Sequence, residues 1–366
     1  MIAISGGKGV TDRARKLQKK GIPILPLDLA LGSISDDGDG ALGLHKEFSE
    51  QPAKFFVHTG EQMRRHILGL SLEMPVLSLT ELASRNIELL AAEIEANEQA
   101  KPIEVLLLSA LPVELQATLH AIGILDQAPR KTRTGINYWR TLLIEGNTRT
   151  VAVASFGAAG NVDAAAITSI LATELQPKII IMIGIAAGIR DKCKLGEVVI
   201  SDRIVAYESA ALIKEQGVSL TSPRPDTYRT LPALQQDVVA YLARETSLRA
   251  RLETAYNAAD IRFPETDAGL VTNEILPRSA TIASGEKLLR DPDKFRALRD
   301  LHGKTEIGEM EAVGIATASL QAGALYLVVR GISDFGDEKK DNRFHVPAAK
   351  AAAIVAVDFI RHGLII

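Results

Sequence analysis

Cysteine is almost absent from this sequence, because Cys193 is the only one among 366 residues. A single cysteine excludes an internal disulfide and a zinc site built from several cysteines. Basic residues are not in surplus either, since 42 Lys and Arg face 45 Asp and Glu, giving a formal net charge of −3 at pH 7. The chain therefore lacks the positive charge with which proteins neutralise phosphate backbones, and we expect no nucleic-acid partner.

Long hydrophobic runs are also missing. The apolar stretches are strand-sized and interrupted by glycine, well below the ~20 residues that cross a bilayer. The first residues, MIAISGGKG, lack the basic start and apolar core of a signal peptide. We therefore expect a cytoplasmic protein with no membrane partner. The remaining composition, 46% hydrophobic and 24% charged, is that of an ordinary globular protein, and the length suits two domains.

The first hundred residues predict a small α/β segment. Short strands are expected at 2–4 and 22–27, on either side of a glycine-rich turn at 5–9 and a helix at 11–20. A second helix is expected at 78–97, followed by a polar linker at 95–102. We assign residues 1–97 to a partial Rossmann-like segment. A glycine-rich turn before a helix can hold a phosphate, so the segment is either a ligand sensor or a structural or docking element.

From residue 103 to residue 366, apolar strands alternate with helices. The run IEVLLLS at 103–109 is continuously apolar, which is typical of a strand covered on both faces. The pattern predicts an α/β fold, a three-layer α/β/α sandwich with a central mixed sheet. The expected strands are 103–109, 138–144, 150–155, 178–184, 197–204 and 325–332, and the expected helices are 113–122, 162–175 and 348–361.

An acidic residue follows the first of these strands. Residues 109–114 read SALPVE, so Glu114 lies in the first turn of the next helix. Ligands of α/β sheets bind beyond the carboxyl ends of the strands, where a carboxylate can act as a general base for water. The alternative is that Glu114 only stabilises the helix N-terminus.

Two carboxylates flank a methionine in the segment GEMEA at 308–312, which we predict to be a glycine-rich turn leading into an alanine-rich helix. Carboxylates accept hydrogen bonds from paired hydroxyls, and a methionine side chain offers an apolar surface to a sugar ring. Acidic residues that merely open a helix are the alternative.

A Ser-Asp pair ends the last apolar strand, in VVRGISD at 328–334. A partly buried Asp334 can act as a general acid, and the hydroxyl of Ser333 can orient it. A structural Ser-Asp turn is the alternative for this segment.

The order of these motifs resembles the purine nucleoside phosphorylase and uridine phosphorylase superfamily. Within it, the chain from residue 103 onward is most similar to the methylthioadenosine and S-adenosylhomocysteine nucleosidases. The resemblance rests on seven segments: SALPVE (109–114), SFGAAGNVDAA (155–165), IMIGIAAGI (181–189), KLGEVVISD (194–202), IASGE (282–286), GEMEAVGIA (308–316) and VVRGISDFGD (328–337).

This resemblance implies an enzyme that hydrolyses the N-glycosidic bond of a purine nucleoside or nucleotide, releasing the free base. Glu114 would activate the attacking water. Asp334 would protonate N7 of the purine, and Ser333 would hold its carboxyl group in place. This is the acid-and-base logic of glycosidases applied to a C–N bond.

The same resemblance implies the substrate-binding residues. Glu311 would accept the ribose hydroxyls, Met310 would pack beneath the sugar ring, and Glu309 would lie close by. The remaining implied contacts are Gly157 and Ala187 near the sugar, and Ser284, Gly285, Glu286 and Leu288 around the base.

Two other activities remain as alternatives. A phosphate-dependent nucleoside phosphorylase must hold a phosphate dianion, usually with Arg and Ser or Thr. The turns at 109–114 and 155–160 contain no Arg or Lys, and Glu114 would repel phosphate, so we predict hydrolysis. A nucleotide-binding sensor without turnover is the second alternative, although the complete set of acids argues against it.

Several positions depart from the resemblance. Ile185 and Ala187 stand where relatives often have a small polar residue and a glycine, so the pocket wall is expected to be tighter. Leu288 replaces an aromatic residue that commonly stacks on adenine, which weakens the case for methylthioadenosine. Lys339 or Lys340 either reaches a 5′-phosphate or belongs to a solvated loop.

Metals and cofactors are not expected. The seven histidines are scattered, and we interpret His345, near the site, as a loop residue rather than a ligand. Members of the superfamily are dimers or larger assemblies whose partner subunit closes the pocket. The resemblance therefore implies a homodimer or larger homo-oligomer that binds a small purine nucleoside or nucleotide.

Overall fold

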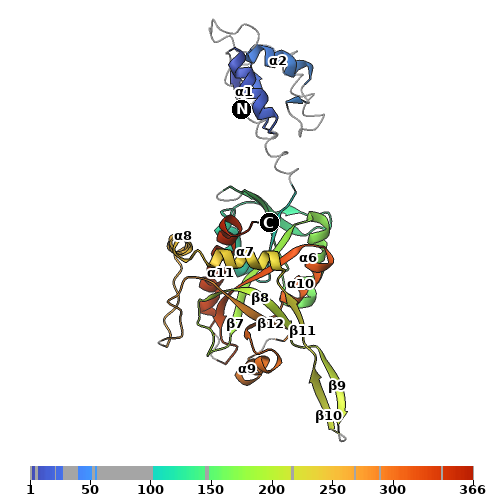
Figure 1. The fold of residues 1–366 in the computed structure, drawn as a ribbon, viewed down its shortest axis with the longest axis vertical. Helices are drawn as coiled ribbons and strands as arrows, with labels where there is room; N and C mark the ends of the chain where they lie inside the picture. The colour runs from blue at the N-terminus through green and yellow to red at the C-terminus, as the bar shows by residue number, and fades with distance from the viewer. Residues whose placement is uncertain are drawn as a thin grey trace. The chain divides into compact units, whose positions relative to one another are not determined.

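The computed structural model describes residues 2–4, 7–20, 22–27, 40–51, 54–55, 102–144, 148–215, 218–267, 269–287, 290–338 and 341–365 (Figure 1). The chain divides into two compact units, Met1–Lys101 and Pro102–Ile366. Among the described residues, no helix is both long and apolar enough to span a bilayer.

The first unit contains the parallel strands β1 (Ile2–Ile4) and β2 (Leu25–Leu27), joined through helix α1 (Lys8–Gln18). Helix α2 (Ala41–Glu50) follows. The second strand is shorter than predicted, because it pairs only with the three residues of β1. Ala14, Leu44 and Phe48 help to form the core of this unit. The helix predicted at 78–97 lies outside the described residues.

The second unit is built on a ten-stranded sheet with the order β11-β8-β12-β13-β7-β3-β6-β5-β4, in which β14 pairs with β7 and β8. Parallel pairs such as β3 with β7 coexist with antiparallel pairs such as β5 with β6, so the predicted mixed sheet is confirmed. The strands are β3 (Val105–Ser109), β4 (Arg130–Lys131), β5 (Asn137–Leu143), β6 (Arg149–Ser155), β7 (Ile179–Gly188), β8 (Val198–Ala206), β11 (Asp226–Arg229), β12 (Arg278–Ser284), β13 (Thr305–Glu309) and β14 (Leu325–Asp334).

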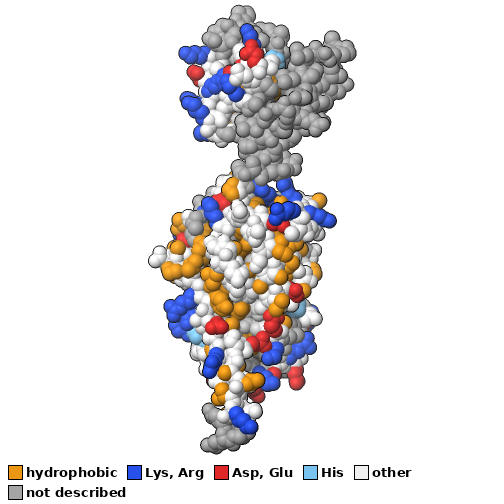
Figure 2. All heavy atoms as spheres, turned by 90° about the vertical axis from the view of Figure 1, so that its right-hand side faces the viewer, with side chains coloured by type: hydrophobic (Ala, Val, Ile, Leu, Met, Phe, Trp, Pro, Cys, Tyr) orange, Lys and Arg blue, Asp and Glu red, His pale blue; other side chains and the backbone are white. Residues whose placement is uncertain are grey.

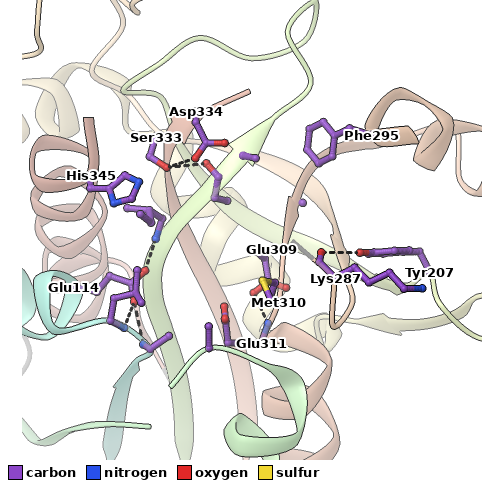
Figure 3. A pocket seen from close by; sticks show the side chains of 17 residues that line it. Glu114, Tyr207, Lys287, Phe295, Glu309, Met310, Glu311, Ser333, Asp334 and His345 are labelled. Carbon is purple, nitrogen blue, oxygen red and sulfur yellow. Dashed lines mark hydrogen bonds between the residues drawn. The ribbon is translucent and has the colours of Figure 1, made fainter. Parts of the chain in front are cut away.

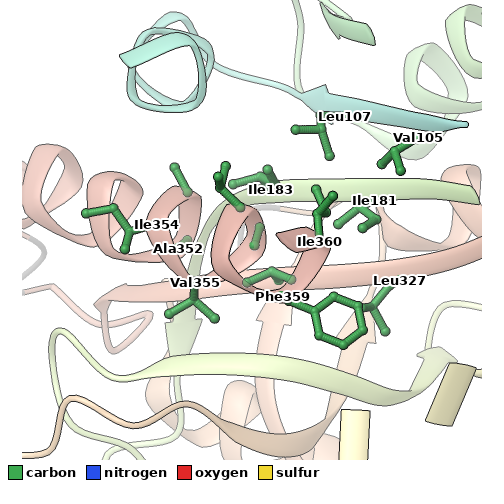
Figure 4. Close-up of a cluster of buried hydrophobic side chains, with 14 of the residues drawn as sticks. Val105, Leu107, Ile181, Ile183, Leu327, Ala352, Ile354, Val355, Phe359 and Ile360 are labelled. Carbon is green, nitrogen blue, oxygen red and sulfur yellow. The ribbon is translucent and has the colours of Figure 1, made fainter. Parts of the chain in front are cut away.

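Helices cover both faces of this sheet. Alternate strand residues face opposite sides, so Leu107 and Ile181 join one core cluster while Leu106 and Ile180 join the other. The first cluster includes residues of α5 (Pro112–Ile122), α7 (Pro232–Leu242), α8 (Glu245–Ala258) and α11 (His345–His362), and Figure 4 shows α11 against the strands. The second cluster includes residues of α6 (Asn161–Leu175) and α10 (Ala312–Gln321). These layers explain why the strands are apolar on both faces.

Two elements extend from the sheet. Strands β9 (Ala210–Glu215) and β10 (Val218–Pro223) pair antiparallel and form a projecting arm (Figure 1). Leu212 on this arm is 87% exposed, and Figure 2 shows hydrophobic side chains there. Helix α9 (Pro292–Leu301) lies between β12 and β13 in the sequence.

The structure corrects two predicted elements. Gly308 and Glu309 belong to strand β13 rather than to a glycine-rich turn, because they pair with Ala283 and Ser284 of β12, and α10 begins only at Ala312. His345 is the first residue of α11 rather than a loop residue, since this helix begins three residues earlier than predicted.

Candidate active site

A cavity of ≈ 340 Å³ lies where β3, β7, β13 and β14 end (Figure 3). Seven residues predicted for the site line it: Glu114, Ala187, Glu309, Met310, Glu311, Ser333 and Asp334. The structure therefore brings together side chains that are more than 200 positions apart in the chain.

Glu114 is held in place by backbone donors. Pro112 opens α5, and the Oε2 atom of Glu114 accepts hydrogen bonds from the backbone N–H groups of Ala110 (2.9 Å) and Leu111 (2.8 Å). Its Oε1 atom accepts one from the N–H of Ile185, at 2.8 Å. Burial raises the pKa of Glu114, while Arg330 and these N–H groups oppose the rise. The carboxyl group thus has a fixed position and a pKa above its usual range.

Arg330 carried no site prediction in the sequence analysis. It is fully buried on β14, and its Nη2 atom forms ion pairs with Glu309 and with Glu311, the latter at 2.9 Å. Its Nη1 atom lies 3.8 Å from Oε1 of Glu114. One guanidinium therefore faces three buried carboxyl groups. A charged residue in the middle of an apolar strand was the signal available in the sequence.

Gly184 provides the space in which two of these side chains meet. A Cβ atom at this position would collide with Nη1 of Arg330 and with the carboxyl group of Glu114. Any other residue would therefore displace the guanidinium or the carboxylate.

The two acids on either side of Met310 have different surroundings. Glu309 accepts hydrogen bonds from the N–H groups of Glu311 (3.1 Å) and Ala312 (3.0 Å), so it caps α10. Glu311 accepts one from the N–H of Gly160 (3.2 Å) and pairs with Arg330. Burial raises the pKa of Glu311 to about 7; Arg330 opposes this rise, and the neighbouring acids add to it. The carboxylate of Glu309 is thus largely occupied by donors of the protein itself. The carboxyl group of Glu311 has a pKa near neutral pH.

Asp334 and Ser333 line the same cavity as Glu114 and come from β14 rather than from α5 (Figure 3). Ser333 is the extra residue of a β-bulge, because Ile332 pairs with Ala186 while Asp334 pairs with Ala187. The Ser333 hydroxyl is within reach of Oδ2 of Asp334 (3.1 Å), and the N–H of Gly336 donates to Oδ1 (2.9 Å). The Asp334 carboxyl group is therefore buried and oriented.

Among the described residues, four other predicted contacts do not line the cavity: Gly157, Ser284, Gly285 and Glu286. The Ser284 hydroxyl lies 3.1 Å from Oδ1 of Asn161, to which it donates, and connects β12 to α6. Gly285 lies beneath the ring of Tyr207, Glu286 and Gly157 are exposed, and Leu288 lies outside the described residues. Lys339 and Lys340 also lie outside them.

The cavity wall includes Tyr207, Phe295 and His345, which carried no site prediction, together with Lys287. The Tyr207 hydroxyl donates to the Lys287 carbonyl at 3.3 Å, and burial together with nearby acids raises the pKa of Tyr207 to about 12. No local motif marks Tyr207 or Phe295, because only the tertiary fold brings them here.

A cavity lined by an oriented Asp334, a buried Glu114 and the side chain of Met310 suits glycosidic bond cleavage. The family model described as the phosphorylase superfamily matches residues 104–361. The chain belongs to the phosphorylase superfamily.

Individual proteins similar to this chain are nucleosidases. The chain is 46% identical over 368 aligned residues to a protein of Escherichia coli (strain KTE188) named ATP nucleosidase Cap17, which covers all of this chain and 72% of that protein. Residues 1–73 match the model described as ATP nucleosidase Cap17-like, N-terminal. A 5′-methylthioadenosine/S-adenosylhomocysteine nucleosidase of Listeria innocua is 28% identical over 206 residues, 55% of this chain and 78% of that protein.

Solved structures agree with the fold. The S-adenosylhomocysteine nucleosidase of Streptococcus pyogenes, in complex with 5-methylthiotubericidin, has a TM-score of 0.53 at 20% identity, covering 71% of this chain and 97% of that one. The Streptococcus pneumoniae MTA/SAH nucleosidase gives 0.52 at 18% identity, covering 72% of this chain and all of that one. The predicted fold, family and purine N-glycosidic bond hydrolysis are confirmed.

Proposed function

We propose that this enzyme hydrolyses the N-glycosidic bond of ATP, releasing adenine and ribose 5′-triphosphate. Support for the substrate comes from the 46% identity, over the whole of this chain, to a protein named ATP nucleosidase. Support for the chemistry comes from one observation, the presence of Glu114 and Asp334 in the lining of one cavity that also contains Met310 and Glu311.

In the proposed reaction, Asp334 donates a proton to N7 of adenine. The electron pair of the C1′–N9 bond moves to the base, which leaves as neutral adenine, and positive charge develops on the ribose. A water oxygen then bonds to C1′, and Glu114 accepts its proton. Ser333 orients the acid through the hydroxyl that lies 3.1 Å from its carboxyl group. Such acid and base contributions are each typically 10²–10⁴-fold.

The sugar would be held by Glu311 and Met310. The carboxylate of Glu311 can accept hydrogen bonds from both ribose hydroxyls when it is ionised. Met310 would offer its apolar side chain to the ring. Glu309 supports this arrangement indirectly, since it caps α10 and pairs with Arg330.

Water is favoured over phosphate as the attacking group by the charges around Glu114. Arg330 is the buried cation of the described cavity region, and it is already paired with Glu309 and Glu311. Lys287, which also lines the cavity, pairs with Glu208. Among the described lining residues, a phosphate dianion next to Glu114 would therefore meet a second negative charge with these two cations already paired.

The test is adenine release measured by chromatography. ATP, AMP, adenosine, methylthioadenosine and S-adenosylhomocysteine would each be supplied with and without phosphate. We expect phosphate-independent release from ATP, and an Asp334→Asn loss of about 10²–10⁴-fold in kcat. Asp260→Asn, at an exposed position, is the matched control. Full activity of Asp334→Asn would contradict the acid assignment, and release only from another substrate would contradict ATP.

Three broader proposals accompany this one. We assign residues 103–366 to catalysis and residues 1–97 to sensing or docking. We expect a homodimer or larger homo-oligomer, supported by exposed apolar residues such as Leu212 and Val162 (72% exposed), and sedimentation velocity tests it. Because nucleoside triphosphates are held inside cells, we expect the enzyme to act in the cytoplasm.

A further inference from the structure

One wall of the catalytic cavity is an aromatic ring that comes from outside every motif of the site. Phe295 lies on α9, whose first turn is capped by the Asp291 carboxylate through the N–H groups of Asp293 and Lys294. Phe295 is only 3% exposed, yet it lines the cavity that contains the two catalytic acids. It is therefore a buried ring with access to a ligand in the site.

The position of this ring is fixed by its packing. It lies directly on the backbone of Gly308, where a Cβ atom would collide with the ring. Phe295 also forms a small apolar cluster with Ile189, Ala283 and Leu298, against which Ala187 packs. A ring held on a strand by such a cluster has little freedom to leave the cavity.

The strand register places this ring relative to Asp334. Ala187 of β7 is paired with Gly308 of β13 on one side and with Asp334 of β14 on the other. Neighbouring strands lie about 4.8 Å apart, so the backbones of Gly308 and Asp334 are separated by about 10 Å across Ala187. Strand β7 runs between these two backbones, and Gly308, Ala187 and Asp334 all line the cavity, which therefore extends across this width.

The other aromatic residue of the wall is less well placed. The ring of Tyr207 lies on Gly285, and its hydroxyl bonds to the carbonyl of Lys287, whose side chain is largely exposed. Figure 3 shows Tyr207 beside Lys287, away from Asp334. Tyr207 packs against the same apolar cluster, but Phe295 is the ring that lies on Gly308, the residue paired with Ala187 next to Asp334.

We propose that Phe295 is the specificity residue that contacts the purine ring while Asp334 faces its N7 edge. This proposal rests on the proposed function, since it assigns the base end of the same site. Aromatic contacts with bases are typically worth a factor of about 5 to 150 in affinity. Phe295 would contact the base and not the C1′–N9 bond, so its replacement should change KM more than kcat.

The experiment compares Phe295→Leu and Phe295→Tyr with the wild type, using calorimetry with adenine and steady-state kinetics with ATP. We expect Phe295→Leu to weaken adenine binding about tenfold and to raise KM for ATP similarly, with kcat changed less than about threefold. Phe295→Tyr retains a ring and should stay close to wild type. Phe359→Leu, a buried phenylalanine of the α11 core, controls for lost packing and should leave adenine binding unchanged.

Three results would overturn the proposal, and two of them are binding results: unchanged adenine binding in Phe295→Leu, or an equal loss in Phe359→Leu. If the loss falls entirely on kcat, Phe295 is a structural support and not a base contact. A wild-type enzyme that binds adenine but releases none from ATP would refute the proposed substrate, while the adenine titrations would still decide the role of Phe295.

Discussion

Glu311 should make the stability of the enzyme depend on pH in a way that one substitution removes. Its carboxyl group is buried, and its pKa is raised from 4.5 to about 7. The folded protein therefore holds this proton more tightly than the unfolded chain does. The resulting contribution to the free energy of unfolding is complete below about pH 4.5 and is lost as the pH rises through about 7.

The size of this effect follows from the pKa difference. A shift of 2.5 units, from 4.5 to about 7, corresponds to about 3 kcal/mol at 1.36 kcal/mol per unit. Glutamine has nearly the same shape but does not titrate, so Glu311→Gln should lack this contribution. We expect the free energy of unfolding of the wild type to fall, relative to that of Glu311→Gln, by about 3 kcal/mol between pH 4.5 and pH 8.

Urea denaturation followed by tryptophan fluorescence measures this difference. Trp139 is the only tryptophan and lies on β5, so the signal reports on the catalytic unit. Titrating groups outside the cluster of Glu114, Glu309, Glu311 and Arg330 cancel when the variant is subtracted from the wild type at each pH. Parallel pH curves for the two proteins would refute the assignment of a raised pKa to Glu311. A divergence of the opposite sign would show that Arg330 outweighs burial.

Two further predictions concern the same buried cluster. Glu114→Gln should lower kcat by about 10²–10⁴-fold while ATP binding is retained, as kinetics and calorimetry would measure, with Glu253→Gln at an exposed position of α8 as control. A fully active Glu114→Gln variant would exclude Glu114 as the base. Gly184→Ala should lower the free energy of unfolding, measured by urea denaturation, by about 1–3 kcal/mol, because the added Cβ atom collides with Arg330 and Glu114. Gly303→Ala is the control and should change this free energy little, because no atom lies near the added carbon. Equal stability of these two alanine variants would contradict the packing around Gly184.

The central strands of the sheet and the acidic residues at their carboxyl ends could be predicted from the sequence. Runs such as 103–109 and 178–184 are apolar on both faces, which only a covered strand requires. Glu114 and Asp334 stand at the ends of such strands, so the carboxyl-end rule and the resemblance to a known family both pointed to them, whereas Glu311 was predicted from the GEMEA motif and the resemblance. The position of an acid at the end of an apolar strand can be recognised from the local sequence.

The parts that were missed depend on tertiary contacts. Strand β13 has only five residues and contains two glutamates, so nothing in TEIGE distinguishes it from a turn until β12 pairs with it. Arg330 was overlooked because its partners Glu309 and Glu311 are about 20 positions away. Phe295 reaches the cavity only because α9 packs on Gly308, a contact that no spacing in the sequence encodes.

The bulge at Ser333 has a consequence for how the acid is specified. Since Ile332 and Asp334 pair with consecutive residues of β7, one extra residue sets the direction in which the carboxyl group leaves the strand. The orientation of Asp334 is therefore encoded by the number of residues in β14 as much as by their identity. Deletion of Ser333 should therefore be more damaging than its substitution, because deletion removes the bulge and turns the side chain of Asp334 toward the other face of the sheet.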